Sequence, residues 1–329
     1  MGIDKKRLIE IMQSFDNKTV AVIGDFCLDE YIYGTATSLS PEAPIPRVVI
    51  DSKTYVPGAA GNVACSIRAL GAITTTFGVI GKDANREILL SEFRKRDIDT
   101  SGIIFTERYT PTYSRIVAGR QQLVRFDLEN KTEVDPNLIE KIFENIGAQS
   151  QDYDAIIFAD YDEVGHGLIR QDLIDNLAQS SARYNQILAG ISRKRLYHLR
   201  NFTLLVPNER EACQAAGLEL KTEEDVEASG RALVQRLNSD VVITRGEQGV
   251  LVFSRDDKGI YTIPSFAKKV VDVTGAGDVL TSAMVLSLAS GASLHEAAHI
   301  GSYAAAVAVS KEGTATVARE EIMELANGK

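Results

Sequence analysis

Short apolar runs alternate with longer amphipathic segments along most of the chain. The runs are rich in β-branched residues, whereas the segments between them repeat apolar positions with the period of a helix. Continuous apolar runs are typical of parallel strands that helices cover on both faces. We therefore predict an α/β fold with a mostly parallel sheet between two helical layers. The clearest predicted strands are 19–23, 73–80, 155–158, 186–188, 204–206 and 241–244, and the clearest helices are 58–70, 84–95 and 279–288.

Two segments break this alternation, at about 31–57 and 103–127. The first contains four prolines and a strand-like run at 47–50, and the second alternates polar and apolar residues. We predict that they form one small antiparallel sheet that projects as a lid from a single domain spanning 1–329. Because so small a sheet leaves an apolar face uncovered, we expect the lid to pair with a second copy of the chain in a homodimer.

Composition narrows the classes of function. The 329 residues include 36 basic and 45 acidic side chains, a net charge of −9, and 44% hydrophobic residues. An acidic chain without a long basic run is a poor partner for nucleic acids or anionic membranes. Its three cysteines are widely spaced, the N-terminus lacks a signal-peptide pattern, and no apolar stretch reaches the roughly 20 residues of a membrane span. We expect a cytoplasmic protein with reduced thiols.

The strongest motif is Asp-Val-Thr-Gly-Ala-Gly-Asp at 272–278, directly before the apolar helix at 279–288. Its glycines allow a tight turn that aims backbone N–H groups outward, and the positive end of the helix adds to them. Such a cradle suits a phosphoryl group whose charge grows during transfer, with Asp278 placed to accept a hydroxyl proton. The alternative is a simple turn with a favourable acidic residue in the first helical turn.

Two weaker motifs have structural alternatives. Asn62 lies at the predicted start of a helix, in the segment 57–64, which is rich in small residues. Small residues let the backbone approach a ligand closely, but they equally let the helix pack closely against the sheet. Asn208 and Glu211 lie three residues apart on one helical face, which suits a hold on hydrated Mg²⁺. They equally fit a helix N-cap with its capping box.

Other familiar motifs are absent or misleading. The chain has no Gly-x-x-x-x-Gly-Lys-Ser/Thr loop and no Gly-x-Gly-x-x-Gly after the first strand. His295 to His299 matches the His-Glu-x-x-His pattern of zinc peptidases. Ser293 and Glu296, however, also form a capping-box pattern, so we expect Glu296 to have a structural task rather than that of a general base.

Together these residues resemble the ribokinase/PfkB-type carbohydrate kinases. The segment 58–62 looks like the N-terminal signature of that family, and 272–278 looks like its Asp-Thr-Thr-Gly-Ala-Gly-Asp signature. Within the family the chain is most similar to the kinase domains that phosphorylate D-glycero-D-manno-heptose 7-phosphate at O1. The residues that carry this likeness are 24–25, 29, 31, 40–44, 121–127 and 160–161. In bifunctional relatives a nucleotidyltransferase domain follows, and we expect these 329 residues to represent the kinase part.

The likeness has departures. Ala59 stands where the family has a second glycine, and Ser302 stands where an asparagine is expected. The family's Asp-Tyr-x-Lys-Gly and Asp-Pro-Lys segments are replaced by 160–165 and 189–193, which lack both lysines. Arg193 and Lys194 are the candidates to replace these positive charges.

The resemblance implies a ribokinase-like kinase that uses ATP and Mg²⁺, and often a monovalent cation such as K⁺, to phosphorylate a small sugar or sugar phosphate. Two alternative functions remain open. One is a kinase of this family with another acceptor (a hexose phosphate, ribose or a nucleoside), and the other is a non-catalytic sugar- or nucleotide-sensing relative. The resemblance implies that Asp278 is the base and that the N–H groups of Gly275, Ala276 and Gly277 bind the transferred phosphoryl group. The implied sugar-binding residues are Asp25, Asp29, Gly58, Asn62, Gln122 and Arg125, and the implied nucleotide-binding residues are Asn208, Thr244, Gly246, Gly249 and Ser302. Glu211 would bind Mg²⁺ indirectly, and Asp272 would bind a monovalent cation.

Overall fold

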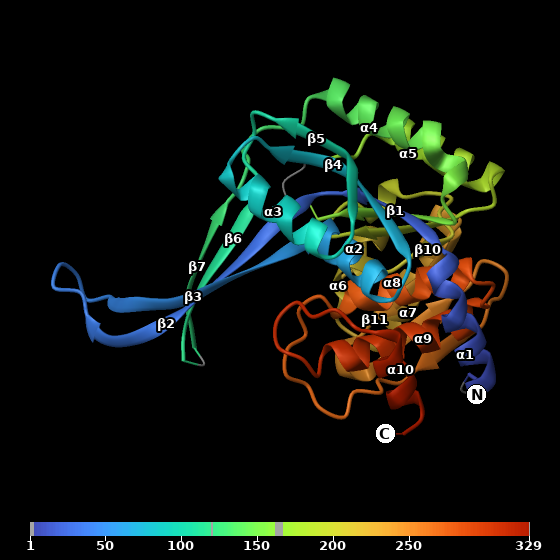
Figure 1. The fold of residues 1–329 in the computed structure, drawn as a ribbon. Helices are drawn as coiled ribbons and strands as arrows, with labels where there is room; N and C mark the ends of the chain where they lie inside the picture. The colour runs from blue at the N-terminus through green and yellow to red at the C-terminus, as the bar shows by residue number, and fades with distance from the viewer. Residues whose placement is uncertain (1–2, 120, 162–166, 329) are drawn as a thin grey trace.

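The main sheet runs through the whole body of the molecule (Figure 1). The computed structural model describes residues 3–119, 121–161 and 167–328, and in these residues nine strands form the sheet in the order β13-β12-β11-β10-β9-β8-β1-β4-β5. Neighbours from β11 to β5 are parallel, and β12 and β13 continue the sheet antiparallel. The strands are β1 (Thr19–Gly24), β4 (Ile73–Gly81), β5 (Asp99–Thr106), β8 (Ala155–Asp160), β9 (Ile187–Ser192), β10 (Leu204–Leu205), β11 (Asp240–Thr244), β12 (Val250–Phe253) and β13 (Ile260–Ile263).

Helices cover both faces of this sheet because its buried strands are apolar on both sides. In β1, Val20 and Val22 face one core, whereas Ala21 and Ile23 face the other. The first core is closed by α1 (Lys5–Gln13), α2 (Ala60–Ala69), α3 (Ala84–Lys95), α8 (Ala276–Ala289), α9 (Leu294–Ala308) and α10 (Arg319–Ala326). The second is closed by α4 (Pro136–Gln149), α5 (Gln171–Arg183), α6 (Glu209–Ala216) and α7 (Glu223–Leu237).

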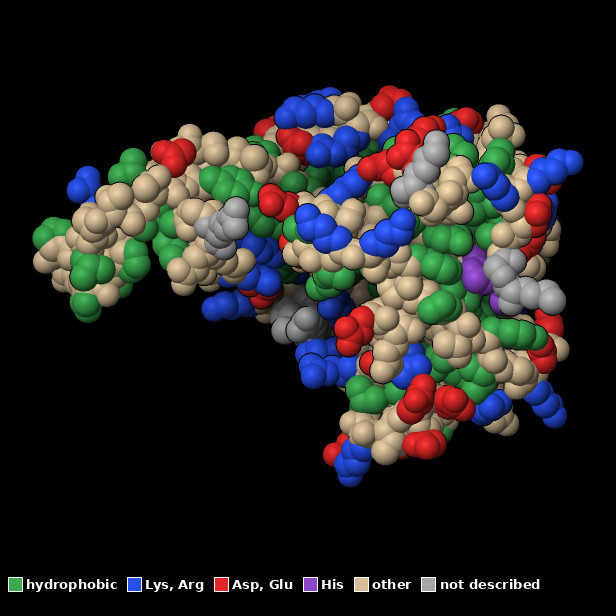
Figure 2. Space-filling model, turned by 90° about the horizontal axis from the view of Figure 1, so that it is seen from below, with side chains coloured by type: hydrophobic (Ala, Val, Ile, Leu, Met, Phe, Trp, Pro, Cys, Tyr) green, Lys and Arg blue, Asp and Glu red, His purple; other side chains and the backbone are tan. Residues whose placement is uncertain are grey.

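A second sheet projects from one side of the body as an arm (Figure 1). It consists of β2 (Phe26–Leu39), β3 (Pro46–Ala59), β6 (Thr112–Ala118) and β7 (Gln121–Leu128), in the order β3-β2-β6-β7. We call it the small sheet. Figure 2 shows hydrophobic side chains exposed along this arm, where no helix covers them.

The structure refines three details of the sequence prediction. Residues 103–106 end β5 of the main sheet, so the predicted lid segment 103–127 begins too early. The central β2–β6 pair is parallel, whereas both outer pairs are antiparallel. The predicted helix 58–70 begins at Ala60, because Gly58 and Ala59 still belong to β3.

Ala59 turns the chain from β3 into α2 with a φ of 53°, in the region that favours glycine. This is the position at which related kinases were expected to carry a second glycine. Separately, the described residues include no helix long and apolar enough to cross a membrane.

Candidate active site

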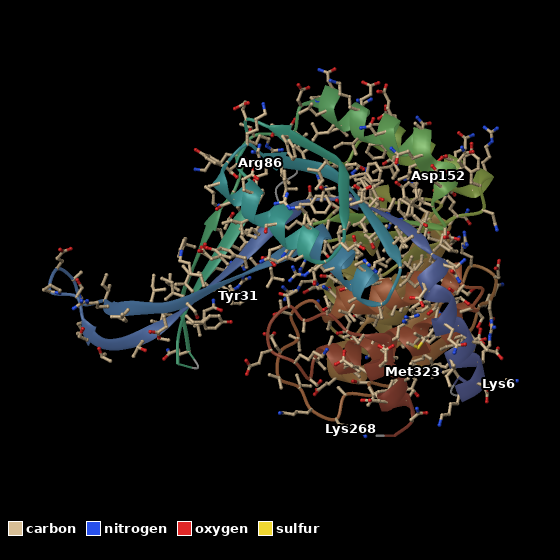
Figure 3. The ribbon with its side chains drawn as sticks, viewed as in Figure 1. Lys6, Tyr31, Arg86, Asp152, Lys268 and Met323 are labelled. Atoms are coloured by element: carbon tan, nitrogen blue, oxygen red, sulfur yellow. The ribbon has the colours of Figure 1, made fainter. Side chains whose placement is uncertain are left out.

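A cavity of about 800 Å³ lies between the small sheet and the carboxyl ends of the main-sheet strands. Ligands of open α/β sheets bind at this edge. Figure 2 shows basic and acidic side chains gathered where the arm joins the body, and Figure 3 shows Tyr31 on the small sheet near this junction. Of the predicted residues, those lining the cavity are Asp25, Asp29, Asn62, Arg125, Gly275 and Asp278.

Asp278 stands where the N-termini of two helices meet. It lies in the first turn of α8, and Asn62, in the first turn of α2, donates from Nδ2 to its Oδ2 at 2.6 Å. Tyr161, which follows β8, donates its hydroxyl proton to the other carboxylate oxygen, Oδ1. The sequence pattern gave Tyr161 no place in the site. Its position directly after a central parallel strand was the signal that could have found it.

Burial sets the protonation behaviour of this group. Desolvation raises the pKa of Asp278 above its ordinary value, although the bonds from Tyr161 and Asn62 and the charge of Arg193 lower it. Burial and the neighbouring carboxylate raise the pKa of Tyr161 well above its usual range, so the phenol keeps the proton that it donates. Desolvation is the largest of these contributions, so the pKa of Asp278 is raised overall.

The turn before α8 forms the predicted phosphate cradle. Gly275 has a φ of 78°, and a Cβ added there would lie 2.6 Å from Nδ2 of Asn62. Among the described residues no hydrogen-bond partner is found for the N–H groups of Gly275 and Gly277. The N–H of Ala276 donates to the carbonyl of Val273 at 3.3 Å, so this third predicted donor is engaged within the turn.

Asp272 links this turn to a second loop. Its carboxylate accepts from the N–H of Thr274 at 2.9 Å and from the N–H of Gly313 at 3.1 Å. Although partial burial acts to raise it, these backbone bonds lower the pKa of Asp272 below its ordinary value. Both carboxylate oxygens therefore accept a backbone hydrogen bond. A monovalent cation at this position would bind oxygens that already accept these bonds.

The small sheet and the end of β1 supply the predicted sugar contacts. Asp25 accepts from the N–H of Tyr161 at 3.1 Å. Asp29 in β2 forms an ion pair of 2.6 Å with Arg115 in β6, a residue that the sequence reasoning missed. Gly58 lies against this carboxylate, because a Cβ there would be 2.3 Å from Oδ2 of Asp29. Glycine at this position therefore makes room for Asp29.

A bulge decides the position of Gln122. Gln122 and Arg125 are three residues apart, so a regular strand would place them on opposite faces. The register shifts between Ile116 and Val117, so that Arg125 pairs with Arg115 and Gln122 pairs with Val117. The bulge returns Gln122 to the face of Arg125, but further along the arm, and it is not among the residues that line the cavity.

The predicted nucleotide residues lie outside this cavity. Asn208 and Thr244 form an isolated bridge between two chain segments. Gly246 and Gly249 both have positive φ in the turn after β11, and Ser302 is buried in α9. None of these five lines the cavity.

Asn208 and Glu211 form the capping box of α6. The N–H of Glu211 donates to Oδ1 of Asn208 at 2.9 Å, and the N–H of Asn208 donates to Oε2 of Glu211 at 2.8 Å. Desolvation raises the pKa of Glu211, and its electrostatic neighbours include both Arg193 and Asp278. The capping-box interpretation is thus confirmed, and the carboxylate of Glu211 is also close enough to that of Asp278 for the two to interact electrostatically.

Arg193 brings a positive charge to the cavity. It follows β9, lines the cavity, and its guanidinium lies 5.5 Å from the centre of the Tyr161 ring. Its charge lowers the pKa of Asp278, Tyr161 and Glu211. Lys194, the other candidate, is not among the lining residues.

The zinc-peptidase pattern has a structural explanation. Ser293 and Glu296 form the capping box of α9, and Glu296 also accepts from Arg7 at 3.1 Å. The rings of His295 and His299 are 4.7 Å apart, but no group of three possible metal ligands occurs in the described part of the chain. Glu296 is therefore a capping residue, as expected.

Comparison with known proteins shows the family of this chain. The description pfkB family carbohydrate kinase matches residues 17–321. The chain belongs to this family. Curated relatives named bifunctional protein HldE include one from Sulfurimonas denitrificans, 33% identical over 96% of this chain, and one from Geobacter metallireducens, 34% identical over 98%. This chain spans 65% of the length of both relatives.

Solved structures support the ribokinase-like fold of this pfkB-family kinase. Phosphofructokinase-2 from Escherichia coli in complex with potassium superposes with a TM-score of 0.78 and 20% identity, over 94% of this chain and 98% of that one. Ribokinase from Arabidopsis thaliana complexed with ribose and ATP gives a TM-score of 0.70 and 17% identity, over 94% and 98%. The predicted fold and the assignment as a carbohydrate kinase are confirmed.

The Tyr161→Phe variant tests the hydrogen bond to the Asp278 carboxylate. A base in the role predicted for Asp278 must be ionised to accept a proton, so we expect activity to fall as the pH drops through its pKa. Loss of the hydroxyl removes a bond that lowers this pKa, so we expect the acid limb of the kcat/KM profile to move to higher pH. Tyr153→Phe, which removes a hydroxyl bonded to Gln149 outside the cavity, is the matched control. An unchanged acid limb in Tyr161→Phe would contradict the assigned contact.

Proposed function

We propose that this kinase transfers the γ-phosphate of ATP to O1 of D-glycero-D-manno-heptose 7-phosphate. The observation that carries the proposal is Asp278, held by Asn62 and Tyr161 at the wall of a cavity that faces the arginine-bearing small sheet. The likeness of the chain to the HldE relatives, over 96% and 98% of its own length, supports the choice of acceptor.

The arginines of the cavity suit an acceptor that already carries phosphate. Four arginines line it, at positions 108, 115, 125 and 193. Guanidinium groups bind phosphate through paired N–H donors. The carboxylates of Asp25 and Asp29 lie on the same wall and suit sugar hydroxyls, which donate hydrogen bonds.

The residues present fit ATP and Mg²⁺. The N–H groups of Gly275 and Gly277 face a phosphoryl position at the start of α8, and a Cβ added at Gly277 would meet no atom within 4 Å. Glu211 would hold Mg²⁺ through its water shell, since this ion keeps several waters and takes only one or two carboxylates. The bound ion would neutralise charge on the ATP phosphates. Asp272 is the proposed contact for K⁺, which the phosphofructokinase-2 structure contains.

Asp278 performs the proton step. Its carboxylate takes the proton of the acceptor hydroxyl as the oxygen attacks phosphorus, while Asn62 and Tyr161 fix both carboxylate oxygens. The amides of Gly275 and Gly277 donate to the oxygens of the transferring group, whose charge grows. Arg193 supplies the positive charge for which related kinases were expected to carry lysine.

Acceptor profiling tests the proposed function. With Mg²⁺-ATP, and with K⁺ present or absent, we expect the highest kcat/KM for heptose 7-phosphate among heptose, hexose, pentose and nucleoside acceptors. Asp278→Asn should lower kcat by roughly 10²–10⁴-fold. It should not lower the thermal midpoint, because it removes a partly desolvated charge. Higher kcat/KM for another acceptor would overturn the heptose assignment, and sugar binding without turnover by the wild type would favour a sensor.

Arg193→Met tests the replacement of the missing lysines. Loss of a charge aimed at the reacting phosphoryl should lower kcat by roughly 10²–10³-fold, with a smaller effect on the KM for the sugar. Arg193→Lys should recover part of the rate, since it keeps the charge but loses the planar fork. Lys194→Met is the matched control, and a larger loss of kcat in that variant would assign the role to Lys194 instead.

We further propose that the small sheet serves as a lid and pairs two copies of the chain. Several apolar side chains on this arm are about half exposed, among them Val49 at 54%, Val124 at 47% and Phe126 at 49%. Exposed apolar surface of this kind is typical of protein interfaces.

Sedimentation of Phe126→Glu tests the dimer. A carboxylate placed within an apolar interface carries a desolvation cost, so we expect the variant to sediment as a monomer at concentrations where the wild type is a dimer. Phe105→Glu is the control, because Phe105 is 42% exposed but belongs to the main sheet. A monomeric wild type, or a Phe126→Glu variant that stays dimeric, would contradict the lid interface.

A further inference from the structure

The face of the small sheet that lines the cavity is ordered by its strand register. Tyr31, Arg115 and Arg125 stand opposite one another on β2, β6 and β7. The next row consists of Asp29, Tyr113 and Asp127. Two arginines therefore stand beside two aspartates and two tyrosines on this one face.

This register places two like charges directly opposite each other. Arg115 and Arg125 are cross-strand partners, and like charges in such positions destabilise a sheet. Each arginine has one acidic neighbour: Arg115 donates to Asp29 at 2.6 Å, and Arg125 donates from Nε to Asp127 at 2.8 Å. These carboxylates offset the repulsion without occupying every donor of the two arginines.

Aromatic rings hold the orientation of both guanidinium groups. Arg115 lies 5.1 Å from the centre of the Tyr31 ring, and Arg125 lies 4.8 Å from that of Tyr113. Among the described residues we find no hydrogen bond from Nε or Nη2 of Arg115, nor from either terminal nitrogen of Arg125. Two oriented guanidinium groups with N–H donors left over match the several oxygens of a phosphate.

We propose that Arg115 and Arg125 together form the subsite for the phosphate that the acceptor sugar already carries. The inference rests on the proposed function, which makes that acceptor a sugar phosphate, and names the residues that recognise it. The subsite lies on the small sheet, whereas Arg193 and the amides before α8 lie on the body beside Asp278. In this proposal, the small sheet binds the phosphate that the acceptor already carries. The body of the molecule binds the phosphoryl group that is transferred from ATP.

Matched acceptor pairs test this subsite. For wild type, Arg125→Gln and Arg115→Gln we would measure kcat/KM for heptose 7-phosphate and heptose, fructose 6-phosphate and fructose, and ribose 5-phosphate and ribose. We expect each substitution to lower kcat/KM for the best phosphorylated acceptor by roughly 10- to 100-fold, the range for a lost bond to a charged group. The value for the matching sugar without phosphate should stay within about threefold in Arg125→Gln.

Arg47→Gln is the control, because Arg47 is an exposed arginine of β3 that does not line the cavity. Arg115→Gln leaves Asp29 without its ion-pair partner and can disturb the sheet, whereas the side chain of Arg125 is 45% exposed and its replacement should leave the thermal midpoint unchanged. The Arg125→Gln result therefore decides the proposal.

Three outcomes separate this inference from the proposed function. If fructose 6-phosphate or ribose 5-phosphate is preferred and its use depends on Arg125, the subsite stands and the heptose assignment falls. If heptose 7-phosphate is preferred but Arg125→Gln lowers kcat/KM equally for heptose, the subsite falls and the function stands. If the preferred acceptor carries no phosphate, both fall.

Discussion

The site depends on one partly buried carboxylate at the meeting point of two helix N-termini. Asp278 opens α8, Asn62 opens α2, and their 2.6 Å contact joins residues 216 positions apart in the chain. The same contact lies against Gly275, where any larger residue would collide with Asn62. The proposed cradle for the transferred group and the proposed base are therefore parts of one packed contact between α2 and α8.

Desolvation changes the proton affinity of Asp278 at this contact. Desolvation raises the pKa of Asp278, and hydrogen bonds from Tyr161 and Asn62 oppose that rise. A carboxylate that is less well solvated, but still held by two donors, is a stronger proton acceptor than an exposed one and has a fixed direction. Arg193 adds a positive charge near three acidic groups, Asp278, Tyr161 and Glu211, which come from three different parts of the fold.

The small sheet completes the site from the opposite side. Its inner face carries Asp29, Arg115 and Arg125, and its exposed apolar residues are available to a second copy of the chain. In the proposed function, the body performs the transfer and the arm selects the acceptor. This division explains why charged residues gather on the inner face, although the arm has little core of its own.

The sequence by itself determined the α/β class, the position of most elements and the cradle before α8, because these follow from local periodicity, glycine placement and capping. The helix at 84–95 has these bounds in the structure, and the capping box at Ser293 and Glu296 explains the zinc-like motif. Only the tertiary structure decided the partners of Asp278, the pairing of Arg115 with Asp29 and the bulge that re-aims Gln122. Contacts between distant segments and the shift of one residue in strand register leave no local pattern, since they arise from packing.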